Sequence, residues 1–182
     1  MDTERKKTYI LEMTNPEDLC PKRADFPDLR VERMETPCPE FNKFLHTMVG
    51  FDYRWGGRTE WGKDRWYAHA DRDEMETWVA YLGGTPAGYY ELERQSDGSV
   101  QIVTFGLLSQ FIGRGLGGHL LTCAVERAWE MGADKVWLST CSHDHPYALE
   151  NYQARGLRVR ETREGPANRP IKSFWELVEA AR

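Results

Sequence analysis

The sequence lacks three features that would each point to a particular class of protein. No segment holds the roughly 18 apolar residues that a membrane-spanning helix needs. Residues 1–7 carry charges, but no apolar run of signal-peptide length follows them, so we expect a cytoplasmic protein without a membrane partner. The four cysteines are scattered without a Cys-x-x-Cys pair, which indicates free thiols in a reducing compartment.

An excess of positive charge is also missing. The 24 lysines and arginines are outnumbered by 29 aspartates and glutamates, which gives a formal net charge of −5. Since phosphate binding requires a basic face, this balance argues against a general nucleic-acid binder. An acidic chain would suit a cationic or amine substrate.

The apolar content is sufficient for one packed domain. Of 182 residues, 40% are hydrophobic and 12% aromatic. Residues 1–27 are polar and interrupted by prolines, so we expect an irregular N-terminal arm followed by a single domain over 28–182. Apolar periodicity predicts a strand over 28–34, an amphipathic helix over 39–50 and a weaker helix from 59 to about 70.

The middle of the chain predicts three consecutive strands. They lie at 76–82, 87–94 and 100–108, and they alternate or run apolar as strands do. Glycine-containing hairpin signals at 83–84 and 97–98 separate them, so these strands are expected to be antiparallel neighbours.

The last third predicts alternating helices and strands. A helix is expected from 116 to about Gly132, a strand over 136–140, a helix over 146–155 and a strand over 157–163. The order predicts a mixed α/β (α+β) sheet whose antiparallel strands come first. The tail over 166–182 fits a helix or an edge strand equally well, through Ile171, Phe174, Trp175 and Val178.

A glycine-rich loop joins the third of these central strands to the following helix. Its sequence is Gly113-Arg114-Gly115-Leu116-Gly117-Gly118. A phosphate at a helix N-terminus is held by unpaired N–H groups and by the helix dipole, and glycines let the backbone approach it. Arg114 would add a charge-assisted contact. The loop therefore predicts a pyrophosphate site, the alternative being a turn that only allows close packing.

The same residues also fit a dinucleotide-binding fingerprint, Gly113-x-Gly115-x-x-Gly118. That fingerprint follows the first strand of a parallel sheet, and an acidic residue ends the next strand. Here several antiparallel strands precede the loop, and the next strand ends at Ser139-Thr140-Cys141. The order of elements therefore disfavours a Rossmann domain.

Two motifs make the chain resemble the GNAT (GCN5-related N-acetyltransferase) superfamily over roughly residues 75–165. The family motif Gln/Arg-x-x-Gly-x-Gly/Ala is matched from Gln110 or, with an isoleucine in first place, from Ile112. The second motif, an alanine, a tyrosine four residues later and then a glycine, is matched by Ala148, Tyr152 and Gly156. The stretch from 105 to 161 is similar to a bacterial group of unassigned acceptor substrate.

The resemblance implies a GNAT-type, mostly antiparallel sheet of about six or seven strands with about four helices. It implies transfer of an acetyl group from acetyl-CoA to a primary amine of a small molecule by direct attack, without a metal. The Leu107 backbone would pair with the pantetheine arm, the Leu108 amide would help to polarise the carbonyl, and Tyr152 would protonate the leaving thiolate. The residues implied to bind the cofactor are Leu107, Leu108, Ile112, Gly113, Arg114, Gly115, Leu116, Gly117, Gly118 and Tyr152. The family often has an asparagine where this chain has His145.

The general base must come from elsewhere in the chain. Glu91 and Glu93 share one face of a predicted strand, and Glu91, which is nearer the apolar part, is the preferred base. The alternative for both is a solvated strand face. His143 and Asp144 offer a second candidate pair.

Two further clusters have a functional and a structural interpretation. The run from Cys141 to His145 could supply three metal ligands but has no fourth ligand nearby, so no metal is expected. The acceptor pocket is expected around an aromatic-rich segment whose residues could equally be core. These residues are Tyr53, Trp55, Trp61, Trp66 and Tyr67.

Two other functions remain open on the sequence. The chain could acetylate protein N-termini or lysines, which would require an open peptide groove. It could also be a non-catalytic acyl-CoA-binding module, which Ile112 and His145 favour and Tyr152 opposes. A homodimer is compatible with the sequence, and the acyl chain length is left open.

Overall fold

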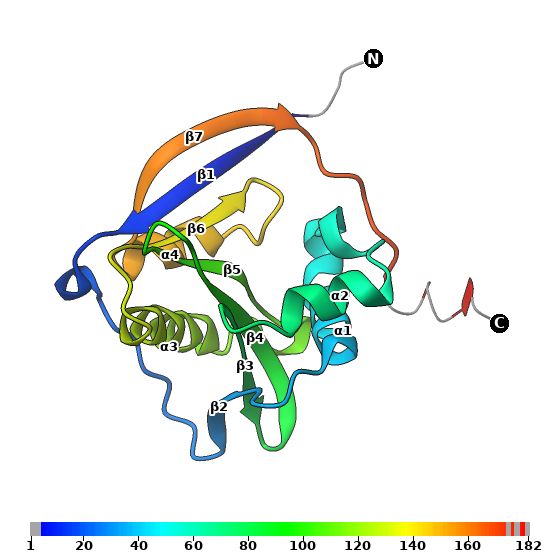
Figure 1. The fold of residues 1–182 in the computed structure, drawn as a ribbon, viewed down its shortest axis with the longest axis horizontal. Coiled ribbons are helices and arrows are strands. Elements are labelled where there is room, and N and C mark those ends of the chain that lie inside the picture. Colours follow the sequence, from blue (N-terminus) through cyan, green and yellow to red (C-terminus); the bar gives the residue numbers. More distant parts are fainter. Residues whose placement is uncertain (1–4, 174–175, 177–178, 181–182) are drawn as a thin grey trace.

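A seven-stranded sheet organises the molecule (Figure 1). The computed structural model describes residues 5–173, 176 and 179–180. Its strand order is β2-β3-β4-β5-β6-β1-β7, and every neighbouring pair is antiparallel except β5 and β6, which are parallel. The predicted mixed, mostly antiparallel sheet is confirmed.

The elements follow the sequence predictions closely from residue 28 onward. The strands are β1 (Arg5–Met13), β2 (Leu29–Arg33), β3 (Met75–Leu82), β4 (Thr85–Arg94), β5 (Val100–Leu107), β6 (Val136–Cys141) and β7 (Arg158–Pro166). The α-helices up to residue 166 are α1 (Pro39–Gly50), α2 (Lys63–Ala70), α3 (Leu116–Glu130) and α4 (Ala148–Ala154). A short 3-10 turn, η3 (Gly56–Arg58), precedes α2, which begins later than predicted because residues 59–60 form a turn and residues 61–62 are irregular.

The prediction of an irregular arm over residues 1–27 is wrong for its first part. Strand β1 lies between β6 and β7, and Leu11 and Met13 are buried in the core. The strand alternates at Tyr9, Leu11 and Met13, but the charged residues around it make the period short and easy to miss. The sheet therefore includes residues that precede the expected domain boundary at 27.

Helices cover both faces of the central strand β4. On one face, Tyr89 contacts His46 of α1 and Glu91 accepts a hydrogen bond from Asn42 of the same helix. On the other face, Tyr90 and Leu92 are buried on the side of α3, whose own apolar stripe is buried against the sheet. Because both faces are covered, even the charged side chain of Glu91 is fully buried.

Strands β5 and β6 are paired along only part of their length. Val100–Ile102 pair with Val136–Leu138, and no pairing continues beyond. At this point Thr104 pairs with Glu91 and Ile102 with Leu92, so Val103 is an extra, bulged residue in β5. A bulge bends its strand. The outer half of β5 therefore diverges from β6 and leaves an opening in the sheet.

The C-terminal tail adds no strand to the sheet in the part that the structure describes. Residues 167–173, including Ile171, have no regular secondary structure. Glu176, Glu179 and Ala180 are helical, whereas Phe174, Trp175 and Val178 lie outside the described residues. No helix in the described ranges combines the length and apolar character that crossing a bilayer requires.

Candidate functional site

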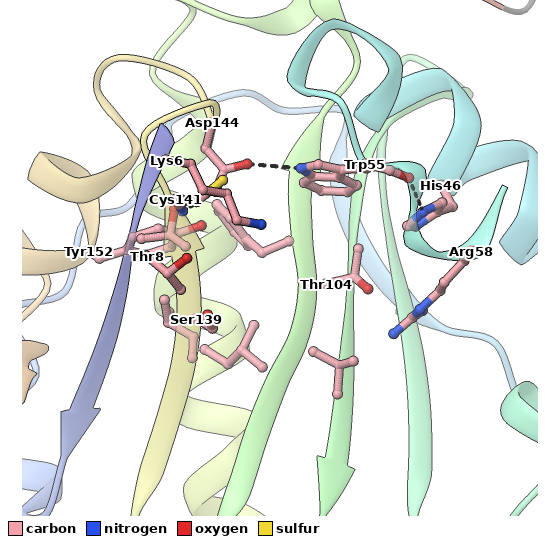
Figure 2. Close-up of a pocket in the computed structure, with 15 residues that line it drawn as sticks. Lys6, Thr8, His46, Trp55, Arg58, Thr104, Ser139, Cys141, Asp144 and Tyr152 are labelled. Atoms are coloured by element: carbon pink, nitrogen blue, oxygen red, sulfur yellow. Dashed lines mark hydrogen bonds between the residues drawn. The ribbon is translucent and has the colours of Figure 1, made fainter. Parts of the chain in front are cut away.

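Two adjacent cavities occupy the opening between β5 and β6. The first, of about 240 Å³, lies between the diverging strands (Figure 2). The second, of about 340 Å³, extends to the glycine loop and the start of α3. Four residues line both cavities and so mark their junction. They are Trp55, Phe105, Asp144 and Tyr152.

The glycine loop forms one wall of the second cavity. Ile112, Gly113, Gly115, Gly117 and Gly118 all line it. Gly113 and Gly115 have φ of +79° and +81°, which L-residues rarely adopt, and no atom lies within 4 Å of where their Cβ would be. Gly115 directly precedes the first residue of α3. The helix N-terminus is thus open to the cavity, as a pyrophosphate site requires.

The positive charge beside this loop comes from a residue that was not predicted. Lys22 lines the second cavity, and its backbone N–H donates to Thr122 Oγ1 of α3 over 2.9 Å. Arg114, the predicted contact, instead lies over the rings of Phe111 and Phe26 and does not line the cavity. Lys22 was missed because it lies almost a hundred residues from the loop, in a segment without a motif.

The backbone of Leu107 faces the opening, whereas that of Leu108 does not. The Leu108 N–H donates to the Ala87 carbonyl of β4 over 2.9 Å. Peptide groups alternate in direction along a strand, so the N–H and C=O of Leu107 are directed away from β4, toward the cavity that its side chain lines. The Leu108 amide is therefore occupied and is not available to polarise a carbonyl. Leu116, predicted in the same group, has a core side chain that is 2% exposed.

Tyr152 lies where the two cavities meet. It is only 7% exposed, and its ring contacts that of Phe105 at a centroid distance of 5.8 Å. Burial, with a smaller effect from the charge of Asp144, raises the pKa of the Tyr152 hydroxyl well above its usual value of about 10. The hydroxyl therefore remains protonated at any working pH. Asn151, its neighbour in the predicted motif, lines the second cavity.

Asp144 connects the end of β6 to the loop after α1. Its Oδ1 accepts a hydrogen bond from Trp55 Nε1 over 2.9 Å, and its Oδ2 accepts one from the Cys141 N–H over 2.9 Å and another from the Thr140 hydroxyl (Figure 2). These contacts fix Trp55 across the opening. Each carboxylate oxygen can accept two hydrogen bonds, so Oδ1 retains acceptor capacity toward the cavities that Asp144 lines.

Glu91 is buried behind the first cavity and does not line it. Its Oε1 accepts a hydrogen bond from Asn42 Nδ2 (2.9 Å), and its Oε2 from Arg58 Nη1 (2.6 Å) and Thr104 Oγ1 (2.8 Å). His69 Nε2 lies 3.2 Å from the same oxygen. Burial alone would raise the pKa of Glu91, but the hydrogen bond with His69 and the charge of Arg58 outweigh it and hold that pKa far below its usual range. Glu91 is fully buried, is held ionised and does not line the cavity, which argues against its predicted role as general base.

His46 lines the first cavity as a neutral ring. Its Nε2 lies 3.1 Å from the Trp55 carbonyl, which can only accept, so Nε2 carries the hydrogen. Its Nδ1 then accepts from the Tyr89 hydroxyl at 3.4 Å. Burial and, to a smaller extent, the charge of Arg58 lower the pKa of His46 to about 4.

The aromatic segment predicted to hold the acceptor is divided by the structure. Trp55 lines both cavities and Tyr53 the second. Trp61 and Trp66 pack against His69 and line neither, and the Tyr67 hydroxyl contacts Glu40 at the surface. In the described part of the chain, no group of three or more His, Cys, Asp or Glu side chains is placed to hold a metal ion.

Comparison with known proteins gives a consistent family signal. Residues 41–157 match the model of the acetyltransferase (GNAT) family. A mycothiol acetyltransferase from Corynebacterium aurimucosum is 37% identical over 87 residues, which are 45% of this chain and 28% of that protein. An uncharacterised N-acetyltransferase, YvbK, from Bacillus subtilis is 29% identical over 85 residues, which are 47% of this chain and 54% of that protein. The chain thus matches between about a quarter and a half of the length of these curated relatives.

Solved structures share the fold at low identity. A GCN5-related N-acetyltransferase from Sphaerobacter thermophilus has a TM-score of 0.62 at 17% identity, over 92% of this chain and 53% of its own. An aminoglycoside acetyltransferase from an uncultured soil sample has a TM-score of 0.58 at 19% identity, over 70% of this chain and 87% of its own. These likenesses support the fold.

Proposed function

Since this chain belongs to the acetyltransferase (GNAT) family, we propose that it transfers an acetyl group from acetyl-CoA to the primary amine of a small molecule. The observation that carries the proposal is the junction of the two cavities. Tyr152 and Asp144, a proton donor and a carboxylate with free acceptor capacity, both line the place where they meet. A donor thioester in one cavity and an amine in the other would react between them.

The second cavity fits the donor. Backbone N–H groups between Gly113 and Gly118 would hold the pyrophosphate at the start of α3, with the Lys22 ammonium beside it. The free N–H and C=O of Leu107 would pair with the amides of the pantetheine arm as an added strand does. Acetyl-CoA supplies the activated acyl group.

The chain's own residues then manage two protons. The Asp144 carboxylate accepts a proton from the ammonium, directly or through a water, so that the amine can attack the thioester carbonyl. The bond from carbon to sulfur breaks, and the Tyr152 hydroxyl donates its proton to the leaving thiolate. The nitrogen loses its second proton as the amide forms, and this proton returns to Tyr152 directly or through a water, which restores the hydroxyl. Glu91, which the sequence favoured as base, serves in this scheme to position Arg58.

Two observations favour a small acceptor over a protein. The first cavity is about 240 Å³ and is bordered by the Trp55 ring, which Asp144 holds across the opening. A peptide substrate would need a longer groove. A non-catalytic acyl-CoA-binding module would have no need of a buried tyrosine hydroxyl at the junction, so Tyr152 also favours the enzyme.

Release of free thiol from acetyl-CoA, measured against a panel of primary amines and a panel of peptides, tests the proposal. We expect turnover with small amines, and an acetylated product of the corresponding mass. Acetylation of peptides alone would support the protein acetyltransferase. CoA binding without turnover of any amine or peptide would support the non-catalytic module and contradict the proposal.

A further inference from the structure

The first cavity contains a fixed cation that the proposed chemistry does not use. Arg58 comes from the 3-10 turn between α1 and α2, lines this cavity and has a side chain that is 14% exposed. Figure 2 shows it on the opposite side of the cavity from Tyr152 and Asp144. A charged group that is so nearly buried needs a counter-charge or hydrogen-bond acceptors. An occupant of the cavity could supply some of them.

The protein provides hydrogen-bond partners for only one side of the Arg58 guanidinium, and the other side has none among the described residues. The polar contacts of Arg58 with described residues both use Nη1, which lies 2.6 Å from Glu91 Oε2 and 3.0 Å from His69 Nε2. A guanidinium has five N–H donors, and those on Nη2 and Nε bond to no other described residue. An arginine held on one edge and open on the other is suited to receive a carboxylate.

Two other charged side chains line the cavity. Lys6, from β1, lies on the side of Asp144 and Cys141 (Figure 2), and its Nζ contacts Asn168. The one carboxylate among the lining residues is Asp144, at the junction. Glu91 lies behind Arg58, fully buried, so the pair directs its positive end into the cavity. The cavity thus has a carboxylate, Asp144, near Tyr152 and an outward-directed guanidinium, Arg58, on the opposite side.

We propose that the acceptor is an amino carboxylate, whose ammonium group lies at Asp144 and whose carboxylate is bound by the free edge of Arg58. This inference rests on the proposed function and names its substrate class. A site built to hydrogen-bond a substrate group discriminates strongly against analogues that lack it, because the donors of the site are then left unpaired. An amine without the anion would leave the free N–H groups of Arg58 in that state.

Matched pairs of acceptors test the inference directly. The probes are ω-amino carboxylates with two to five carbons, each compared with its own carboxamide, in the thiol-release assay. The carboxamide keeps the amine and the chain length but removes the negative charge. For the chain length that spans the cavity best, we expect kcat/KM to be at least about tenfold higher for the carboxylate, which is the effect of one buried charge-assisted contact.

Variants then locate the preference. Replacing Arg58→Gln together with Glu91→Gln removes both charges, which avoids a buried carboxylate without a partner. The ratio of kcat/KM for carboxylate over carboxamide should fall to about one in this double variant, and Arg58→Lys should give an intermediate ratio. Arg65→Gln is the matched control, because Arg65 stacks on the same Trp61 ring as Arg58 but is exposed and does not line the cavity. Its ratio should equal that of the wild type.

The outcomes separate this inference from the function on which it rests. A ratio near one in the wild type, or an unchanged ratio in a folded double variant, overturns the inference and leaves the acetyltransferase intact. Acetylation only of amines that lack a carboxylate has the same meaning. If no amine of any kind is acetylated, the proposed function fails as well.

Discussion

The two cavities of this protein differ in whether backbone groups or side chains form their binding surfaces. The second cavity presents backbone to its occupant, through the glycine loop and Leu107, within one stretch of about a dozen residues. The first presents side chains that come from distant parts of the chain, among them Lys6, Arg58 and Asp144. A site made of backbone tolerates many sequences but depends on conformation. A site made of buried charges depends on each partner and on pH.

The difference also concerns what maintains each cavity. Around the glycine loop, positive φ angles and a helix N-terminus keep N–H groups open without any buried charge. Around the first cavity, a network of Glu91, Arg58 and His69 must offset the cost of removing charges from water. Variants that change backbone strain in the glycine loop should therefore alter CoA binding. Variants that change charge or packing around the first cavity should alter binding of the amine.

The largest effect is expected at the junction, where both cavities depend on one residue. In Tyr152→Phe the ring remains but the proton donor is lost, so kcat should fall by about a hundred- to a thousandfold, as loss of a general acid does. The dissociation constant of CoA, measured by calorimetry, should change less than about twofold, because the backbone contacts remain. Tyr67→Phe, which removes a surface hydroxyl, is the control. An unchanged kcat in Tyr152→Phe would show that another group protonates the thiolate.

The next largest effect is a pH dependence of folding stability that comes from His46, a residue of the first cavity only. His46 has a pKa of about 4 in the folded protein, below the value of about 6.5 for an unfolded chain. The unfolded state therefore binds more protons between these values, so this stabilisation is complete above pH 6.5 and is lost as the pH falls toward 4. The loss should approach roughly 3 kcal/mol in the free energy of unfolding.

Urea unfolding of the wild type and of His46→Gln across pH 4–7 measures this dependence. The difference between the two proteins should shrink as the pH falls, because only the wild type carries the buried imidazole. Curves that stay parallel would mean that His46 is not held neutral by burial, and the first cavity would not have the charge environment described above.

A smaller effect tests the backbone character of the second cavity. Gly115 and Gly132 lie just before and just after α3, with φ of +81° and +82° and no atom within 4 Å of an added Cβ. Alanine should cost each a similar ~1 kcal/mol of folding stability. Only Gly115 lines the cavity, so Gly115→Ala should weaken CoA binding by about tenfold, which is ~1.4 kcal/mol. Equal CoA affinities in the two variants would show that the glycine loop does not contribute to CoA binding.

The smallest effect concerns the packing of the first cavity. A Cβ on Gly50 would lie 2.5 Å from the Cβ of Trp55, so Gly50→Ala should push the indole from its place across the opening. Overpacking of this kind costs about 1 kcal/mol or more, and we expect the KM of the amine to rise about fivefold. Gly57→Ala, where no atom lies within 4 Å, is the control and should behave as the wild type. An unchanged KM in Gly50→Ala would show that Trp55 does not border the acceptor.

The features of the second cavity that lie in local sequence motifs could be predicted from the sequence, whereas side chains brought together from distant segments could not. The strands and helices after residue 28 and the glycine loop could be predicted, because periodicity and local motifs encode them. The role of the Leu107 backbone came from the family resemblance, and the strand pairing then showed that its peptide groups are directed away from β4. Arg58 and Lys22 could not be found, since nothing near them in the sequence marks them and only the folded chain brings them to a cavity.

The same argument explains the misplaced roles. Glu91 lies on the predicted strand face, but periodicity gives a face and not its occupants, and here α1 and α2 cover that face with Asn42 and His69. Arg114 has the right neighbours in sequence, yet the rings of Phe26 and Phe111 attract its guanidinium away from the loop.

The structure of the protein with bound CoA tests the central claim most directly, because the claim concerns where CoA binds. We predict the pyrophosphate against the backbone between Gly113 and Gly118, the pantetheine arm along Leu107, and the sulfur within about 3.5 Å of the Tyr152 hydroxyl, a distance that allows proton transfer. A pyrophosphate away from the glycine loop, or a sulfur that does not reach the junction of the two cavities, would contradict the account.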